Sequence, residues 1–352
     1  MKYQTIEQCK QRIAQLQANP KFAQIAKDFI QNRKTFNDEL DFCKDILTIG
    51  YGRFPFDGEK IKGNFFHDKE LVELMIGFYR HLDSLAGDDN SLQLTAVDNM
   101  QYLNFVHDPD YRSNCGMRNF VRHINVGIGG SVRDPANVAH EVGHSQSKNF
   151  ITGKPFKDEN MREFCTVIID RIFPEYLKEQ RPDLAENVLH NLADTQFVNR
   201  AKAQLSLFEG AFVRAVAGEI TADDAMDEYS KIYGKNIERA NELLELVDKV
   251  TDPTVTKKPE FRPLYETRYL FPQMLGIYAR EEYLKNPVEF AKKFKKVLQR
   301  DCEITEAEAL DMLGFPEREK IVQWYKDNIA KILEREYGVT GKENEDEIGK
   351  EA

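Results

Sequence analysis

Two histidines stand four residues apart in the stretch AHEVGH, and a glutamate directly follows the first of them. On an α-helix, His140 and His144 lie on the same side one turn apart, so both imidazoles can bind one metal ion. Glu141 lies about 100° further around the helix, where it can reach a water molecule at the metal without occupying the metal itself. These residue types at this spacing predict a zinc site that activates water, with Glu141 as the general base.

A pattern of five residues also arises by chance, and two histidines on one helix face can be ordinary packed residues. The flanking segments favour the metal site. Residues 120–132 alternate β-branched residues before a Gly-Gly pair, which predicts a strand. Asp134 and Pro135 then suit the cap and the first turn of a helix. We therefore expect both histidines on a helix that begins directly after a strand.

A catalytic zinc ion needs three protein ligands and one open position. The next acidic residues along the chain are Asp158, Glu159, Glu163 and Asp170. We prefer Glu163 as the third ligand because Thr166 and Asp170 share its helix face, at i+3 and i+7. Asp170 can accept a hydrogen bond from the free nitrogen of a histidine ligand and so fix its tautomer. Glu159 remains the alternative ligand, and solvated surface acids are the alternative interpretation.

The segments DPANVAHEVGHSQS and EFCTVIID resemble the paired motifs of the M3 family of zinc peptidases, the thimet oligopeptidase and oligoendopeptidase F group. In that family an HExGH helix is followed by a helix with the pattern E-x-x-[S/T]-x-x-x-[E/D]. The resemblance implies that Glu163 is the third zinc ligand and that Thr166 and Asp170 support the ligands. The gap between the two motifs is shorter than in typical members, so a looser match to other zincins with a glutamate ligand stays open.

The segment from Arg262 to Pro316 resembles the C-terminal region of the same family. Tyr265 and Tyr269 match the family's Y-x-x-x-Y pattern, and on a helix they lie one turn apart. The resemblance implies that such a tyrosine donates a hydrogen bond to the oxyanion formed during peptide hydrolysis. The alternative is that both tyrosines are ordinary core residues.

The chain also departs from the family pattern. The stretch KKPEFRP lacks the histidine that usually precedes the first tyrosine, Phe271 and Pro272 stand where a third tyrosine is expected, and Ser147 replaces a frequent histidine. Arg262 or Arg268 can compensate as charge stabilisers, or can form surface salt bridges. The chain is shorter than a typical member, and we expect the missing part to come mostly from the N-terminal half that roofs the cleft.

Three glycines in the predicted strand region suggest a substrate contact. In zincins the strand before the metal helix pairs with an extended substrate through backbone hydrogen bonds. Gly127, Gly129 and Gly130 would allow a close backbone approach there, and a flexible turn is the alternative. Cys115, just before this strand, is not expected to be a nucleophile because no histidine partner is fixed near it by the sequence.

The chain has 352 residues, 41% hydrophobic and 31% charged, which is typical of a globular protein with a sizeable core. A net charge of −10 argues against nucleic acid or an anionic membrane as the main partner, and no apolar run suits a membrane span. A peptide substrate is what the family resemblance implies. The five cysteines are scattered, and the first residues lack the apolar core of a signal peptide. We expect a cytoplasmic protein, with export by a non-classical route as the alternative.

Helical periodicity dominates the chain, over residues 5–32, 68–87, 160–173, 183–207, 222–250, 264–284, 288–298, 306–313 and 317–337. With the resemblance, it predicts a mainly α, zincin-like (gluzincin) fold with a small β-sheet beside the HExxH helix and a helical C-terminal half that forms a cleft. The expected organisation is an N-terminal helical subdomain at 1–100, an M3-like catalytic region at 101–340 and a disordered tail at 341–352.

The sequence thus predicts a zinc metallopeptidase, an oligopeptidase that holds one Zn²⁺ per chain. The alternative is a catalytically weak or inactive M3-like protein that binds zinc or peptide, which the missing histidine and third tyrosine motivate. A zinc hydrolase that uses the same ligands on another substrate is a third hypothesis.

Overall fold

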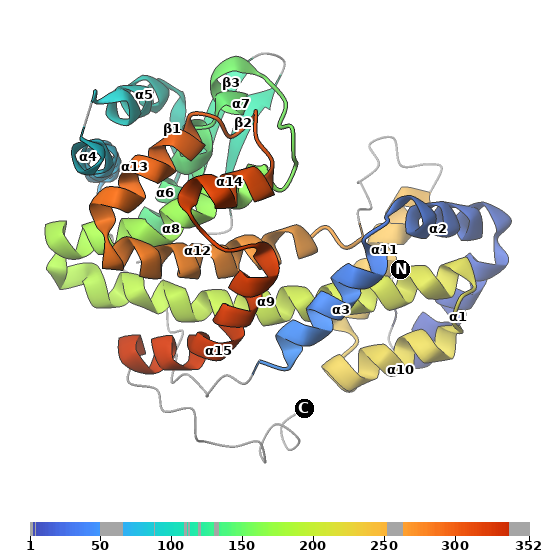
Figure 1. The fold of residues 1–352 in the computed structure, drawn as a ribbon. Coiled ribbons are helices and arrows are strands. Elements are labelled where there is room, and N and C mark those ends of the chain that lie inside the picture. The colour runs from blue at the N-terminus through green and yellow to red at the C-terminus, as the bar shows by residue number, and fades with distance from the viewer. Residues whose placement is uncertain are drawn as a thin grey trace. The chain divides into compact units, whose positions relative to one another are not determined.

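The computed structural model (Figure 1) describes residues 3, 5–49, 66–87, 89–108, 111, 113–118, 121–129, 134–251 and 263–337, and for residues 118, 183–198, 251 and 337 it describes the backbone alone. Helices make up most of these residues, and three short strands form one sheet. The predicted fold class, mainly α with a small sheet beside the HExxH helix, is confirmed. None of the described helices combines the length and the apolar character that crossing a bilayer requires.

The chain forms two compact units that are not contiguous in sequence. The first unit combines residues 1–53, 197–270 and 340–352, and the second combines residues 54–196 and 271–339. Helices α9 (Pro182–Ala217) and α12 (Thr267–Lys285) contribute residues to both units. The N-terminal helical subdomain expected at residues 1–100 stays a prediction. The assignment of residues 101–340 to catalysis stays a prediction, and the tail at 341–352 lies outside the described residues.

The first unit is helical throughout its described residues. Its core contains Cys9, Ile13, Phe208, Tyr229 and Leu244, which are all fully buried. Its elements, besides the parts of α9 and α12, are α1 (Ile6–Ala18), α2 (Pro20–Asn32), α3 (Phe36–Leu47), α10 (Ala222–Tyr233) and α11 (Glu238–Thr251).

Two long helices predicted in the first unit are each divided in the structure. The helix predicted over residues 5–32 ends at Ala18 because Pro20 has no N–H to continue it. The Asn19 side chain then accepts from Lys21 N and caps α2. The helix predicted over residues 222–250 ends at Tyr233, and Gly234 follows it with a positive φ of 59°.

The second unit contains the sheet, which consists of β1 (Leu103–Val106), β2 (Asn114–Arg118) and β3 (Val121–Gly127) (Figure 1). The strand order is β1-β3-β2, with β3 parallel to β1 and antiparallel to β2. Ile124 and Val126 alternate to one face of β3 and are fully buried. Helix α6 (Asp134–Ser145) packs against β2 and β3, so the sheet holds the helix that carries the two histidines.

The other helices of the second unit complete its core. Helix α4 ends where the sequence predicts, because Gly87 adopts a φ of 81° that ends the helix. Helix α8 runs past the predicted end at residue 173 and includes Pro174 within it. These elements are α4 (Asp68–Ala86), α5 (Ser91–Asn99), the 3₁₀ turn η1 (Met100–Tyr102), α7 (Lys148–Thr152), α8 (Met161–Gln180), α13 (Pro287–Leu298), α14 (Glu306–Leu313) and α15 (Arg318–Tyr337).

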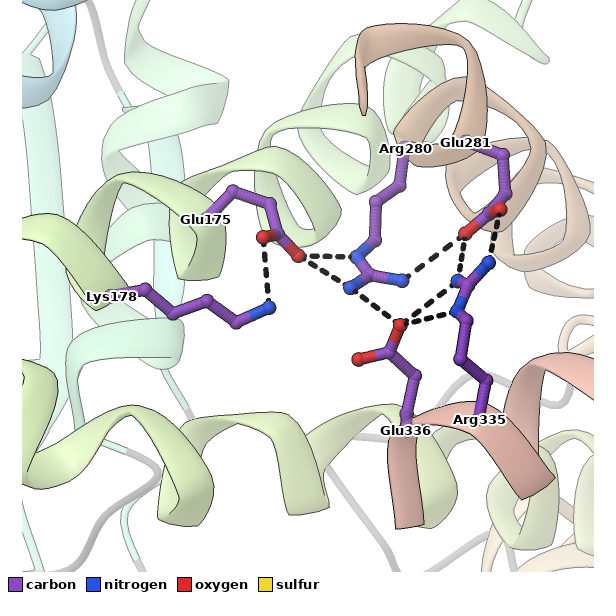
Figure 2. Close-up of polar contacts among 6 residues, drawn as sticks. All are labelled: Glu175, Lys178, Arg280, Glu281, Arg335 and Glu336. Atoms are coloured by element: carbon purple, nitrogen blue, oxygen red, sulfur yellow. Dashed lines mark hydrogen bonds and ion pairs between the residues drawn. The ribbon is translucent and has the colours of Figure 1, made fainter. Parts of the chain in front are cut away.

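A cluster of six charged side chains joins three helices of the second unit (Figure 2). Arg280 on α12 is only 1% exposed, and its guanidinium lies 2.6 Å from Glu175 Oε1 on α8 and 3.2 Å from Glu336 Oε1 on α15. Arg335 completes the cluster by contacting Glu281 at 2.6 Å. We call this group the Arg280 cluster, and its members are Glu175, Lys178, Arg280, Glu281, Arg335 and Glu336.

Candidate metal centre

Helices α6 and α8 pack closely enough for their side chains to share one site. Gly143 on α6 explains this approach, because a Cβ atom there would lie 3.2 Å from Thr166 Cγ2 and 3.3 Å from Ile169 Cδ1 of α8. Those distances are tighter than ordinary van der Waals contacts, so a larger residue would push the two helices apart. The glycine thus brings the histidines of α6 against the acidic face of α8.

Three side chains from these helices converge on one point. Glu163 Oε2 lies 3.7 Å from His140 Nε2 and 3.5 Å from His144 Nε2. One nitrogen of each imidazole and one oxygen of the carboxylate all lie within 4.8 Å of one another. Four tetrahedral ligands at 2.0–2.1 Å from zinc are separated by roughly 3.4 Å, so the two distances to Glu163 are close to what the ion requires. This is the one such group of histidine, cysteine and acidic residues found among the described residues.

Each imidazole is also held through its second nitrogen. His140 Nδ1 lies 2.8 Å from Asp170 Oδ2, and His144 Nδ1 lies 3.1 Å from Thr166 Oγ1. An ionised carboxylate can only accept, so His140 Nδ1 donates to Asp170, and the lone pair of the neutral imidazole is then on Nε2, the nitrogen beside Glu163. The face of α8 that the sequence singles out at Glu163, Thr166 and Asp170 therefore meets both histidines.

The centre holds more negative charge than its imidazoles can balance. Burial, with the charges of Glu163 and Asp170, raises the pKa of Glu141 to about 7 and outweighs the lowering by His140. Burial by itself would lower the pKa of His140. The charge and the hydrogen bond of Asp170, together with the charges of Glu163 and Glu141, have the larger effect and raise this pKa to about 9. Three carboxylates around two imidazoles favour a proton or a cation, and a divalent metal ion fits this donor set.

The alternative acidic ligands are engaged elsewhere. Glu159 has a side chain that is 72% exposed and forms an ion pair with Arg162 at 3.1 Å. Asp158 accepts from the backbone N–H groups of Asn160 and Glu306, both at 3.0 Å. Of the four acidic residues considered from the sequence, Glu163 alone joins the His140–His144 group.

The predicted pairing of a substrate with the strand before α6 stays a prediction. Strand β3 is the central strand, and β1 and β2 occupy its two edges. Gly127 does permit a close backbone approach, but a Cβ there would lie 2.5 Å from the carbonyl oxygen of Tyr111 in the same chain. Gly129 N donates to Asp134 Oδ1 at 3.2 Å, its substrate contact stays a prediction, and Gly130 lies outside the described residues.

Cys115 belongs to β2 and is partly buried. Burial raises the pKa of its thiol, and the charge of Glu141 raises it further. Both influences oppose the thiolate form that a nucleophilic cysteine requires. This agrees with the expectation that Cys115 is not a nucleophile.

The two tyrosines singled out by the resemblance lie in the first unit. Helix α12 begins at Thr267, so Tyr265 precedes the helix and Tyr269 lies in its first turn, instead of both being one turn apart on a helix. Their rings are 6.1 Å apart. Arg268 lies between them and donates to both hydroxyl oxygens, a bridge that the sequence did not indicate. The catalytic role of either tyrosine stays a prediction.

The fold is similar to those of solved peptidases. A protein assigned as an oligoendopeptidase F matches with a TM-score of 0.61 at 11% identity, over 93% of this chain and 58% of that chain. An oligoendopeptidase F assigned in Bacillus anthracis str. Ames matches with a TM-score of 0.57 at 12% identity, over 92% of this chain and 56% of that one. PZ peptidase A, solved with an inhibitor, matches with a TM-score of 0.56 at 12% identity, over 92% of this chain and 58% of that chain.

At this level of identity the likeness shows the fold, which is the fold of the M3-type peptidases that the sequence resembles. The chain spans a little over half of the length of these neighbours. No protein-family model matches the chain, and no curated protein matches it in sequence.

Proposed function

We propose that this chain is a zinc-dependent peptidase of the M3 type that hydrolyses peptide bonds at the centre formed by His140, His144 and Glu163. The observation that carries the proposal is the convergence of two imidazoles and one carboxylate within 4.8 Å, on a fold similar to oligoendopeptidases. Two histidines and a glutamate are a ligand set that catalytic zinc sites use, with one position left open. The neighbours' peptidase names are the reason to propose peptides as the substrate.

The ligands are arranged so that their lone pairs point to one place. Asp170 fixes His140 through Nδ1 and Thr166 contacts His144 through Nδ1, which leaves both Nε2 atoms beside Glu163. A zinc ion bound there would supply Lewis-acid chemistry, which polarises the scissile carbonyl and makes a water molecule acidic near neutral pH.

Glu141 is the residue that moves the proton. Its side chain is buried next to His140, where a carboxylate can accept a proton from the attacking water. It takes a proton from the attacking water and then gives it to the leaving amine. We further propose that Tyr269, and Tyr265 beside it, donate to the oxyanion, where one such donor contributes about 3–4 kcal/mol in the transition state.

The test is cleavage of a peptide library, read by mass spectrometry with and without a chelator. The Glu141→Gln variant should lose about 100- to 10,000-fold in rate while it keeps its metal, because it removes the base and no ligand. Glu159→Gln is the matched control: it changes the exposed acid on the same segment and should cleave at the wild-type rate.

Two outcomes would contradict the proposal. Wild-type cleavage by Glu141→Gln would remove Glu141 from the mechanism. One bound metal ion per chain with no cleavage across the library would replace a peptidase by a protein that binds metal or peptide without hydrolysis.

A further inference from the structure

Two of the three candidate metal ligands lie in the terminal turns of their helices. His144 is the second-last residue of α6, and Glu163 is the third residue of α8. The terminal turns of a helix open more easily than its middle, because their outer backbone groups have no partner within the helix. The separation of these two ligands therefore depends on what holds the end of α6 and the start of α8.

A buried aspartate holds the end of α6. Asp301 belongs to the turn between α13 and α14, residues 299–305, and is 2% exposed. Its Oδ1 accepts from the backbone N–H of Lys148 at 3.2 Å. Burial raises the pKa of Asp301, whereas hydrogen bonds from the Ser147 hydroxyl and the Lys148 N–H lower it. Ser147 N in turn donates to the carbonyl oxygen of His144 at 3.2 Å, so the chain directly after this ligand is connected to a buried carboxylate.

A second aspartate holds the start of α8. Asp158 Oδ1 accepts from Asn160 N, and its Oδ2 accepts from Glu306 N, both at 3.0 Å. The backbone carbonyl of Asp158 also accepts from Met161 N at 3.0 Å. Met161 is the first residue of α8, and Glu306 is the first residue of α14. One carboxylate therefore connects the beginning of α8, the helix that carries Glu163, to the end of the same α13–α14 turn.

Backbone contacts continue between these two points. Lys157 N donates to the carbonyl oxygen of Cys302 at 3.1 Å, and Cys302 Sγ lies 3.5 Å from the carbonyl oxygen of Lys154. Glu303 in the same turn forms ion pairs with Lys148 and Lys154, but its side chain is 37% exposed. Exposed ion pairs contribute little, whereas hydrogen bonds to backbone groups fix the course of the chain. The two aspartates, more than Glu303, should therefore hold the connection in place.

We propose that Asp158 and Asp301 are positioning residues of the candidate metal centre. By connecting the end of α6 and the start of α8 to the α13–α14 turn, they hold His144 and Glu163 at the separation that a metal ion requires. Ligands that are already in place lose less freedom on binding, so the metal is bound more tightly. The proposal rests on the proposed function, from which it takes the ligands, and both aspartates act through the ligand helices.

The test is the zinc affinity of the purified full chain, measured by competition with a chromogenic chelator. Asp158→Ala and Asp301→Ala should each weaken zinc binding by about 10-fold, the low end for residues that orient metal ligands. Asp301→Asn keeps an acceptor for the Lys148 N–H and should restore most of the affinity. The matched controls Glu159→Ala and Glu303→Ala remove an exposed acid from each segment and should bind zinc as the wild type does.

A double variant tests whether the two aspartates share one role. Both act on the separation between α6 and α8, so removing the second should matter less once the first is gone. The variant with both alanines should therefore bind zinc clearly better than the roughly 100-fold loss expected from two independent tenfold effects. The visible spectrum of the cobalt-loaded protein should change in both single variants, because it depends on ligand geometry. Circular dichroism of the metal-free variants shows whether they are folded at the assay temperature.

The outcomes separate this proposal from the proposed function. Wild-type zinc affinity in both alanine variants, equal losses in the two controls, or fully additive losses in the double variant would overturn the positioning role and leave the metal centre intact. Lower thermal stability with unchanged affinity would also overturn it, since that result indicates a purely structural role. If Asp301→Ala does not fold, Asp158→Ala alone decides the test. A wild-type chain that binds no zinc would instead contradict the proposed function.

Discussion

The second unit contains two clusters of partly buried ionisable side chains that share helix α8, and the groups that balance their carboxylates differ. The Arg280 cluster has three carboxylates and three basic side chains: Glu175, Glu281 and Glu336 with Lys178, Arg280 and Arg335. The candidate metal centre also has three carboxylates, but imidazoles take the place of the permanent cations. They are Glu141, Glu163 and Asp170, with His140 and His144.

The two clusters differ in the groups that neutralise their carboxylates. In the Arg280 cluster, guanidinium and ammonium groups are charged at every physiological pH, so the chain neutralises its own acids. In the metal centre, neutrality requires protons, and the raised pKa values of His140 and Glu141 express that requirement. A divalent cation satisfies the same requirement without protons. Charge balance, more than burial, therefore separates a structural ion cluster from a metal site.

The largest expected effect comes from removing a metal ligand. His144→Ala should reduce bound metal from one ion per chain to background and lower kcat/KM by more than about 1000-fold, because three protein ligands are needed. Metal content by atomic emission and cleavage assays measure both effects. Glu281→Gln, an equally local change in the Arg280 cluster, should keep the metal. Equal metal loss in both variants would contradict the claim that the metal depends on the candidate metal centre and not on the Arg280 cluster.

A substitution in the Arg280 cluster should lower the free energy of unfolding without changing the metal content. Arg280→Met removes a guanidinium that is 1% exposed and leaves Glu175 and Glu336 without it. We expect a loss of about 3 kcal/mol in unfolding free energy, the low end for a broken buried pair, because Lys178 and Arg335 still neutralise part of the charge. Urea denaturation measures the loss. A folded variant with reduced metal content would show that the two clusters are coupled through α8.

A smaller effect on metal affinity should follow when the hydrogen bond between Asp170 and the ligand His140 is changed. Asp170→Asn keeps an acceptor for His140 Nδ1 but removes the charge that holds the imidazole, which should weaken metal affinity by about 10- to 100-fold. Competition with a chromogenic chelator gives this affinity. The exposed acid change Glu159→Gln serves as the control. If Asp170→Asn binds the metal with unchanged affinity, the charge of Asp170 does not contribute to metal binding.

The smallest effect concerns pH and the metal-free protein. The folded pKa of His140 is about 9 against an ordinary 6.5, and that of Glu141 is about 7 against 4.5. Both are raised, so their stabilisation is fully present below the ordinary values and is lost as pH rises through the folded values. The metal-free protein should therefore lose roughly 2–6 °C in melting temperature between pH 6 and pH 9, and bound metal should restore it.

Thermal melts with and without a chelator across this range test the prediction. His140→Asn removes the titrating group and should flatten the metal-free profile. The exposed His107→Asn is the matched control and should leave the profile unchanged. A metal-free profile of the wild type that rises with pH would reverse the sign of the argument.

Features that depend on neighbours within about one turn were predictable from the sequence. The spacing of His140 and His144 places both on one face of any helix, and α6 is a helix. Gly87 ends α4 in the left-handed conformation that glycine adopts easily. Helix α14 begins and ends where its periodicity indicates, and a capping box at Thr305 fixes its start. Pro20 carried an equally local signal, and reading it would have divided the first predicted helix.

The strands and their pairing were not predictable in the same way. Strand β1 has four residues and β2 has five, too few for a clear alternation. Their partner β3 lies elsewhere in the chain, and its central place in the sheet appears only when both neighbours pair with it. The sequence of β3 alone therefore did not predict its place in the sheet.

The sequence by itself determined which residues share a face: His140 with His144 on one helix, and Glu163 with Thr166 and Asp170 on the next. Only the tertiary structure decided that these faces meet, since side-chain spacing along a helix does not say which neighbour the helix packs against. Gly143 permits that contact, and it places Glu163 beside both imidazoles while Glu159 stays in solvent. The same holds for Arg268, whose bridge between the tyrosines follows from a turn whose conformation only packing can enforce.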